Sequence, residues 1–328
     1  MKAIIVKETG SPEVLKLQEV KKPKPSADQV LIRVEAISVN FADIKARQGQ
    51  YHGVAADAAF TPGLDCAGVI VEIGDQVTRF QLGERVMAFP AGGSYAEFVV
   101  APENLTYAVP DDISSEMAAA SLTVGITAYN VIRKMARLEQ GETILIHAAA
   151  GGIGSTAIQL AKLFGASKII GTVGSDEKID RAKSFGADEV INYRSVDFVG
   201  KVNELTAGKG ADVILDTVAG ENFDKSLKCL ATFGRIVSFG HANDGSVPGI
   251  AKTDQLHSRC RSVIGYSTGT YRKNRPEFLR EGAEKITEYL LQKQLKTVIS
   301  KSFALADAAD AHVHIESRSS IGKVLLIP

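Results

Sequence analysis

Small residues dominate one short stretch in the middle of the chain, HAAAGGIG at residues 147–154. Ala149, Gly151 and Gly154 fit the pattern A-x-G-x-x-G, and the stretch lies between the apolar run TILIHA and the amphipathic run STAIQLAKLFG. At a strand-to-helix turn this pattern lets a pyrophosphate approach backbone N–H groups and the positive end of the helix, while the last glycine allows close packing. The pattern predicts a dinucleotide site with contacts at residues 151–154. The alternative is a tight turn that binds nothing.

The sequence after the next apolar run indicates which dinucleotide is bound. An acidic residue at the tip of this strand would hold the adenosine ribose of NAD and repel an additional phosphate. Here the strand reads KIIGTVGSDEK, and its tip is Val173, Gly174 and Ser175. Ser175 can donate a hydrogen bond and Lys178 can neutralise a phosphate, so the tip predicts NADPH rather than NADH. The acidic residues at positions 176–177 either reach the ribose or stabilise the first turn of the next helix.

The arrangement of apolar runs predicts the elements that hold these residues. After about residue 125, short apolar runs alternate with helical stretches, which indicates a doubly wound parallel sheet of α/β class. The six predicted strands are TILIHA, KIIGTV, EVINY, DVILDTV, RIVSFG and SVIGY. Before residue 125 the chain is rich in alternating strand patterns and Pro or Gly turns, which predicts a small barrel or curled sheet. The tail predicts a helix from Pro276 to about Gln292 and a last strand, VLLIP, that returns to the first region.

Composition narrows the class of partner. The chain has 328 residues, with 38 Lys plus Arg and 38 Asp plus Glu, so no excess of charge favours nucleic acid or an anionic membrane. No apolar run reaches the roughly 20 residues needed to cross a bilayer, and the N-terminus lacks a signal-peptide pattern. Three widely spaced cysteines, Cys66, Cys229 and Cys260, fit reduced packing residues. We therefore expect a cytoplasmic protein with a small-molecule substrate.

Several motifs together resemble the medium-chain dehydrogenase/reductase superfamily, and in it the zinc-free, zeta-crystallin-like quinone oxidoreductase branch. They are AAAGGIG, GTVGSDEK, FGADEVINY, DTVAG and PGLDCAGVIVEIG. The resemblance implies a Rossmann domain at residues 125–267 and a GroES-like catalytic domain built from residues 1–124 and 268–328, with the cofactor in the cleft. It also implies a homodimer that forms through the last Rossmann strand, around SVIGYS.

The same resemblance argues against zinc. Asn40 stands where metal-dependent relatives have a cysteine ligand, and Gly63, Leu64 and Asp65 stand where they have Gly-His-Glu. Three scattered cysteines cannot build a structural zinc lobe, and an i, i+2 histidine pair at residues 312–314 is poorly placed on a helix. Without a Lewis acid, we expect an acceptor that is already electrophilic, such as a quinone or a conjugated enone.

The remaining site residues are predicted from chemistry and from this resemblance. Asn40 is expected to hydrogen-bond the cofactor or the substrate, or else to be a turn residue, and Tyr51 is the candidate proton donor. Thr127 is expected near the nicotinamide. Arg318 is expected to reach the cofactor or to be a solvated surface side chain. The rim at the carboxyl ends of the strands adds Tyr193, Thr217, Phe239, Gly240 and Tyr266.

These observations predict an NADPH-dependent reductase that transfers hydride to a quinone or similar enone without zinc. Two alternatives remain open. One is reduction of enoyl thioesters or alkenals, and the other is a non-catalytic NADPH-binding protein with a structural or regulatory role.

Overall fold

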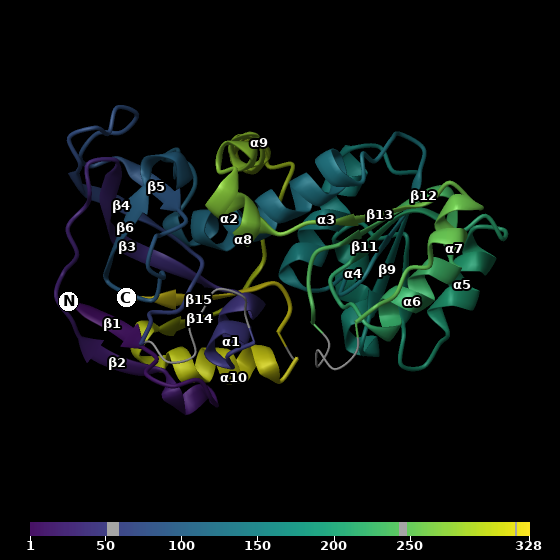
Figure 1. Cartoon of the computed structure of the whole chain (residues 1–328), viewed down its shortest axis with the longest axis horizontal. Coiled ribbons are helices and arrows are strands. Elements are labelled where there is room, and N and C mark those ends of the chain that lie inside the picture. Colours follow the sequence, from purple (N-terminus) through teal and green to yellow (C-terminus); the bar gives the residue numbers. More distant parts are fainter. Residues whose placement is uncertain (51–58, 243–247, 319) are drawn as a thin grey trace. The chain divides into compact units, whose positions relative to one another are not determined.

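The computed structural model describes residues 1–50, 59–242, 248–318 and 320–328 (Figure 1). The chain divides into two compact units. The mixed-sheet unit comprises Met1–Val124, Tyr271–Lys293 and Thr297–Pro328, and the parallel-sheet unit comprises Gly125–Thr270 and Gln294–Lys296. The proton donor expected at Tyr51 lies outside the described residues.

Six parallel strands form the sheet of the parallel-sheet unit, in the order β10-β9-β8-β11-β12-β13. Renumbered along the chain this order is 3-2-1-4-5-6, that of a Rossmann fold, so the predicted α/β class is confirmed. Strand β11 is buried along its whole length, as expected where helices cover both faces of a parallel sheet. The strands are β8 (Thr143–Ile146), β9 (Lys168–Val173), β10 (Glu189–Asn192), β11 (Ala211–Asp216), β12 (Leu230–Ser238) and β13 (Ser262–Gly265).

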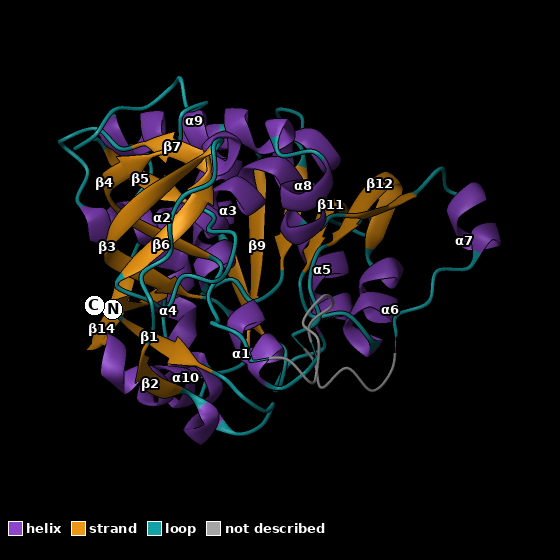
Figure 2. Cartoon of the chain, turned by 60° about the vertical axis from the view of Figure 1, so that its left-hand side comes forward, coloured by secondary structure: helices purple, strands orange, loops and turns teal. Residues whose placement is uncertain are grey.

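Helices alternate with these strands (Figure 2): α3 (Gly152–Leu163), α4 (Ile179–Ser184), α5 (Phe198–Leu205), α6 (Glu221–Lys228) and α7 (Thr253–His257). Helices α2 (Ser115–Tyr129), before β8, and α8 (Thr268–Asn274), after β13, each contain residues of both units. A π-helical segment, Asn130–Met135, follows α2, and one 3₁₀ turn, Asp176–Lys178, follows β9. The predicted strand-helix alternation is therefore present.

The mixed-sheet unit contains a seven-stranded sheet in which the long strand β3 pairs with β4, β6 and β15. Its C-terminal strand β15 lies between β3 and β14, so the chain end returns to the first region as predicted. The strands of the sheet are β3 (Gln29–Val39), β4 (Asp65–Ile73), β5 (Arg85–Ala88), β6 (Phe98–Pro102), β7 (Thr106–Ala108), β14 (Ile299–Ala304) and β15 (Lys323–Ile327). A separate pair, β1 (Lys2–Ile5) and β2 (Lys16–Glu19), is antiparallel.

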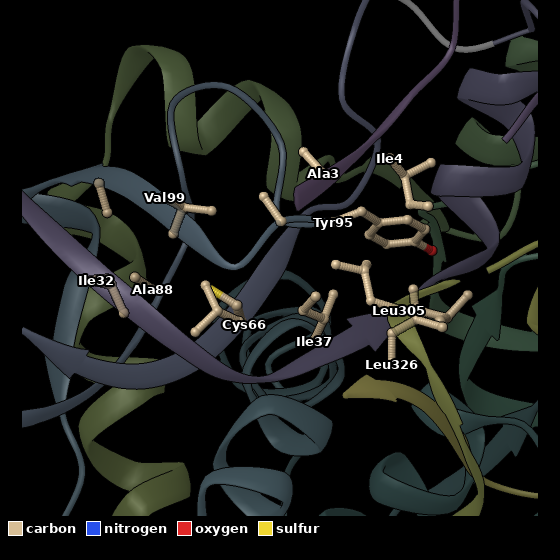
Figure 3. Packing of buried hydrophobic residues seen from close by; sticks show 14 of the residues in the cluster. Ala3, Ile4, Ile32, Ile37, Cys66, Ala88, Tyr95, Val99, Leu305 and Leu326 are labelled. Atoms are coloured by element: carbon tan, nitrogen blue, oxygen red, sulfur yellow. The ribbon is translucent and has the colours of Figure 1, made fainter. Parts of the chain in front are cut away.

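Three α-helices accompany this sheet: α1 (Phe41–Arg47), α9 (Glu277–Leu291) and α10 (Ala308–Glu316), together with the 3₁₀ turns Pro12–Val14, Glu103–Leu105 and Leu305–Asp307. Figure 3 shows part of the core of this unit, a cluster of buried side chains that includes Ile4, Ile37, Cys66, Leu326 and the ring of Tyr95. Arg47 at the end of α1 is 1% exposed and forms an ion pair with Glu316 at the end of α10. The two helices are thereby tied together.

Two of the three cysteines pack as predicted, and one does not. Cys66 and Cys229 are buried, whereas Cys260 is exposed, on a backbone with φ of 50°. The prediction that Cys260 is a packing residue was wrong, because it lies in the turn between α7 and β13 rather than on a core-facing strand. Within the described ranges, every helix is too short or too polar to cross a bilayer.

Candidate active site: a dinucleotide turn and a buried polar cluster

The stretch HAAAGGIG forms the turn between β8 and α3. Gly151 precedes the helix in an extended conformation, and α3 begins at Gly152. A Cβ atom on Gly154 would lie 2.3 Å from the backbone oxygen of Ala148, whereas one on Gly151 would lie 3.2 Å from the same atom. Gly154 is therefore required by packing, and Gly151 leaves open the space in front of the helix. The turn brings the expected contacts Gly151, Gly152, Ile153 and Gly154 together at the N-terminus of a 12-residue helix.

The first residue of this stretch is a buried histidine, His147, whose ring is held by two hydroxyl groups. His147 Nδ1 lies 2.8 Å from Thr172 Oγ1, and its Nε2 lies 2.9 Å from Ser226 Oγ. Burial lowers the pKa of His147 to about 4, against the opposing charge of Asp216, so the ring is neutral at pH 7. Sequence reasoning missed this role, since the hydroxyl partners are 25 and 79 residues away.

The tip of β9 brings together part of the residue set predicted to hold a ribose phosphate. A Cβ on Gly174 would lie 2.9 Å from Tyr193 Oη, so the tyrosine hydroxyl rests against this glycine. Tyr193 is 43% exposed, and Ser175 is half-buried in an extended conformation beside it. Gly174, Ser175 and Tyr193 are thus brought together, and Lys178 ends the following 3₁₀ turn.

Asp176, the acidic residue closest to this tip, is already engaged. Its Oδ1 accepts a hydrogen bond of 2.8 Å from Asn192 Nδ2 at the end of β10. This contact is neither of the two roles predicted for Asp176; it ties the carboxylate to the end of β10, and both roles stay predictions. Asn192 is a residue that sequence reasoning missed.

The loops after β11 and β12 lie against each other. A Cβ on Gly240 would be 2.5 Å from Thr217 Oγ1, and Phe239 N–H donates to the backbone oxygen of Asp216 at 3.0 Å. The buried Asp216 carboxylate accepts from the N–H groups of Val218 and Ala219, which shapes the loop. Thr217, Phe239 and Gly240 therefore share the carboxyl edge of the sheet, where such folds bind ligands.

Thr127 and Tyr266 belong to one hydroxyl network. Thr127 Oγ1 lies 2.8 Å from Thr268 Oγ1, and Thr268 Oγ1 donates to Tyr266 Oη at 3.3 Å. The buried Asn130 donates from Nδ2 to Tyr266 Oη at 3.0 Å. Asn130 and Thr268 were not predicted; Asn130 starts the π-helical segment, a feature that often marks functional sites but has no simple sequence signal.

In the mixed-sheet unit, three strand ends meet around Asn40. Asn40 follows the last residue of β3, Asp65 begins β4 and Lys323 begins β15. The pairing register places Ser38 opposite Asp65 and Val39 opposite Val324, which brings these side chains to one corner of the sheet. Asn40 Nδ2 donates to Asp65 Oδ1 at 2.7 Å, and Lys323 Nζ donates to Asn40 Oδ1 at 2.7 Å. We call Asn40, Asp43, Asp65 and Lys323 the buried polar cluster.

Burial perturbs every charged member of this cluster. Asp43 and Asp65 are at most 1% exposed. Desolvation raises the pKa of both carboxyl groups, and it raises that of Asp43 to about 7. Burial lowers the pKa of Lys323, while the two carboxylates oppose that change. Asp43 also accepts hydrogen bonds from the Asn40 N–H at 2.8 Å and from Tyr95 Oη at 3.2 Å. Asp43 and Lys323 were not predicted as site residues.

The donor set of this cluster does not suit zinc. The Asn40 amide is already held by an ammonium and a carboxylate, and Leu64 cannot ligate a metal. Among the residues that the structure describes, no group of three or more His, Cys, Asp or Glu side chains is placed to hold a metal ion.

Arg318 is a predicted cofactor contact that belongs to the mixed-sheet unit. It lies after α10 in the mixed-sheet unit, with an exposed side chain and φ of 58°. Its proposed role toward the cofactor stays a prediction.

Comparison with known proteins places the chain in a family. Residues 26–111 match the model of the alcohol dehydrogenase GroES-like domain, and residues 152–284 match that of a zinc-binding dehydrogenase. A quinone oxidoreductase of Pseudomonas aeruginosa is 36% identical over 321 residues, 97% of each chain. A 2-haloacrylate reductase of a Burkholderia species is 34% identical, over 99% of this chain and 98% of the relative. The solved structure of Escherichia coli quinone oxidoreductase complexed with NADPH superposes with a TM-score of 0.92 at 34% identity, covering 100% of both chains.

The chain belongs to the quinone oxidoreductase branch of the medium-chain dehydrogenase/reductase superfamily. The resemblance seen in the sequence is thereby confirmed, as are the Rossmann and GroES-like folds. One of the two matched models is described as a zinc-binding dehydrogenase, but that model covers residues 152–284. At positions 40 and 64, where metal-dependent relatives have zinc ligands, this chain has Asn and Leu.

Proposed function

We propose that this chain is an NADPH-dependent reductase that transfers a hydride to a quinone or a similarly activated enone without zinc. The observation that carries the proposal is the tip of β9. It presents Gly174 and Ser175 beside Tyr193, while Asn192 holds the nearby carboxylate of Asp176. A site of this kind accepts a phosphate on the adenosine ribose.

The protein's contribution is binding and orientation, since NADPH when bound supplies the hydride. The N–H groups of residues 151–154 hold the pyrophosphate, and Ser175, Lys178 and Tyr193 hold the ribose phosphate. The cofactor contacts on the carboxyl edge are Thr217, Phe239, Gly240 and Tyr266, to which the proposal adds Thr127, Asn40 and Arg318. Tyr51 is the proposed proton donor.

A conjugated acceptor explains why no Lewis acid is needed. The charge that arrives with the hydride spreads over the conjugated oxygen of a quinone or an enone. The 2-haloacrylate reductase relative, whose name denotes reduction of an activated alkene, supports an acceptor of this class. Enoyl thioesters and alkenals are the neighbouring alternatives, and a substrate panel assayed with NADPH separates them.

The cofactor preference is tested with the double variant Ser175→Ala/Lys178→Ala. We expect KM for NADPH to rise about 10-fold or more, because charge-assisted hydrogen bonds to a phosphate are lost, while KM for NADH changes little. The matched control is Lys183→Ala/Ser184→Ala on the exposed part of α4, which should alter neither value. Equal increases for both cofactors in the first variant would contradict the proposal.

We also propose a homodimer and a cytoplasmic location. Among the residues that the structure describes, β13 is the last strand of the parallel sheet and pairs with β12 alone, so its other edge could pair with a second copy of the chain. Two buried thiols and one exposed thiol, all unpaired, are compatible with a reducing compartment.

A further inference from the structure

Tyr95 connects the buried polar cluster to helix α10 through the core of the mixed-sheet unit. Its ring belongs to the hydrophobic cluster shown in Figure 3, and its hydroxyl oxygen lies 3.2 Å from Asp43 Oδ2 and 3.0 Å from His312 Nε2. Asp43, Tyr95 and His312 are each at most 1% exposed. Three titratable side chains, from α1, from the segment before β6 and from α10, are thus joined by hydrogen bonds that are shielded from solvent.

The hydroxyl of Tyr95 has a single hydrogen, so it cannot donate to both neighbours. When Asp43 is a carboxylate, Tyr95 donates to Asp43, and His312 Nε2 carries a hydrogen that it donates to Tyr95 Oη. When Asp43 is protonated, Asp43 donates to Tyr95 Oη. A buried O–H is costly to leave unpaired, so Tyr95 then donates to an Nε2 without hydrogen, and the ring hydrogen of His312 is on Nδ1. The Asn40 N–H, 2.8 Å from Asp43 Oδ2, remains bonded in both arrangements.

We propose that Asp43, Tyr95 and His312 form a proton relay between the buried polar cluster and the solvent beside α10. A hydronium ion gives a proton to His312 Nδ1, the Nε2 hydrogen passes to Tyr95 Oη, and the phenol hydrogen passes to Asp43 Oδ2. The imidazole and the phenol are neutral before and after the transfer, and Asp43 gains the proton that the hydronium ion loses. No atom other than hydrogen has to move.

The His312 end of the relay is close to a polar groove. Among the residues that the structure describes, His312 Nδ1 and the Nε and Nη1 atoms of Arg47 are buried without a hydrogen-bond partner. The Arg47 charge contributes to the lowered pKa of His312, so the two side chains are near each other, and polar atoms grouped in this way bind water. Glu316, one turn after His312 on α10, lines the groove together with residues 10–12, Arg47, Gln48 and Gln50.

The charges around the relay place the transferred proton on Asp43. Desolvation and the Asp65 carboxylate raise the pKa of Asp43 to about 7, against the opposing effect of Lys323. At the other end, burial and the Arg47 charge lower the pKa of His312 to about 3, although Arg47 is itself paired with Glu316. Burial also raises the pKa of Tyr95 well above its usual value, so the phenol does not lose its hydrogen to solvent.

The relay also bears on the proposed function, on which this part of the inference rests. Reduction of a quinone or an enone consumes one proton with each hydride. The relay brings protons to the cluster that contains Asn40, a proposed contact of the cofactor, and Asp43 is bonded to the Asn40 N–H. It therefore serves as a route by which solvent replaces a proton that turnover removes from the cluster.

The first test follows the ring nitrogens of His312 by ¹⁵N NMR of cofactor-free protein, assigned by their absence in His312→Gln. Nitrogens with and without a hydrogen have well-separated resonances, which distinguishes the two neutral tautomers from each other and from imidazolium. As pH falls from about 8.5 to about 5.5, we expect His312 to change from the Nε2–H to the Nδ1–H tautomer. The midpoint should be near pH 7 and should coincide with that of the Asp43 carboxyl ¹³C resonance.

His147 is the internal control, because its neighbours allow one tautomer only. Ser226 Oγ donates to the backbone oxygen of Asn222 at 2.7 Å, so it accepts from His147 Nε2, and Nδ1 accepts from Thr172. Burial lowers the pKa of His147 to about 4, so its ring nitrogens should not change over this pH range.

Variants test whether the tautomer change passes through Tyr95. Tyr95→Phe and Asp43→Asn should each abolish the change at His312, whereas Tyr107→Phe, which alters another buried tyrosine of the same unit, should preserve it. A His312 ring that keeps one tautomer in wild type, or that becomes imidazolium in this pH range, would overturn the relay. So would a tautomer change that persists in Tyr95→Phe.

The second test measures oxidation of NADPH by a quinone. Tyr95→Phe should lower kcat about 10-fold or more and change KM for NADPH less than about 2-fold, because the variant lacks a proton carrier, and Tyr107→Phe should match wild type. An unchanged kcat in Tyr95→Phe would overturn the role of the relay in turnover. If the NMR test shows the relay but the wild type oxidises no NADPH, the proposed function fails while the relay stands.

Discussion

Gly151 and Gly154 are glycines for different physical reasons. At Gly154 a methyl group would meet the Ala148 carbonyl oxygen at 2.3 Å, and this backbone atom has little freedom to move. We expect Gly154→Ala to lower the free energy of unfolding by about 2 kcal/mol or more. Gly151→Ala, with a contact of 3.2 Å, should stay within about 0.5 kcal/mol of wild type.

Alanine variants of the same two glycines distinguish an effect on stability from an effect on cofactor binding. Gly151→Ala should weaken NADPH binding about 10-fold, because its methyl group occupies the space of the pyrophosphate. Urea unfolding and fluorescence titration of NADPH measure the two effects. A stable Gly154→Ala protein, or unimpaired binding by Gly151→Ala, would contradict the role given to that glycine.

At this scale the sequence predicts the geometry of a local turn better than it predicts contacts between residues far apart in the chain. The glycine turn and Ser175 are readable because their spacing lies within one strand-turn-helix unit. Lys323 is 283 residues from Asn40, and the strand that it begins has no distinctive sequence pattern. The contact between the two side chains follows from the register of β15 against β3, which the sequence does not reveal. Asp43 is only three residues from Asn40, but in the sequence nothing distinguishes it from any acidic residue in the first turn of a helix.

Helix α10 contains a buried histidine, His312, that is expected to lower the stability of the folded protein at acidic pH. His312 Nε2 lies 3.0 Å from Tyr95 Oη, and burial lowers the pKa of His312 to about 3. An unfolded histidine has a pKa near 6.5, so between these values the unfolded chain binds more protons and stability falls as pH falls. The raised pKa of Asp43 acts in the opposite sense, since its contribution is lost as pH rises toward about 7.

His312→Gln isolates the histidine contribution. Between about pH 7.5 and about pH 5, wild type should lose about 1 to 2 kcal/mol more unfolding free energy than this variant. His257→Gln, on the exposed surface of α7, serves as the control and should follow wild type in urea titrations at the two pH values. If wild type and His312→Gln showed the same pH dependence, burial would not lower the pKa of His312 and this account of α10 would be wrong.

Element positions follow largely from apolar periodicity. All six predicted strands of the parallel sheet and the helix predicted from Pro276 are present, the latter at Glu277–Leu291. Strands buried on both faces stand out as continuous apolar runs between glycine-ended helices. The π-helical segment at Asn130–Met135 has no such signature, because backbone bonds of a different spacing leave the side-chain pattern nearly helical.

The whole molecule is expected to be a dimer that forms through β13. Sedimentation equilibrium should give about twice the chain mass of 34.9 kDa. Val263 lies on this edge strand and is 38% exposed, so Val263→Lys should shift the equilibrium to monomer while the unfolding free energy of the monomer stays within about 0.5 kcal/mol. A wild-type monomer at micromolar concentration would contradict the proposed interface.

At the scale of the whole chain, the sequence predicts the fold and the cofactor better than the acceptor. The return of the C-terminal strand to the first region is visible as an apolar run with no partner nearby. Acceptor choice depends on loop side chains such as those around Tyr51, where no periodic pattern links residue type to position.

The central claim is most directly tested by following NADPH absorbance when purified, metal-free protein is mixed with a quinone. The account predicts steady oxidation of NADPH that depends on the quinone, persists in the presence of a zinc chelator and is much slower with NADH at equal, sub-saturating concentration. NADPH that binds tightly but is not oxidised by quinones, enones or enoyl thioesters would contradict it and favour a structural or regulatory role.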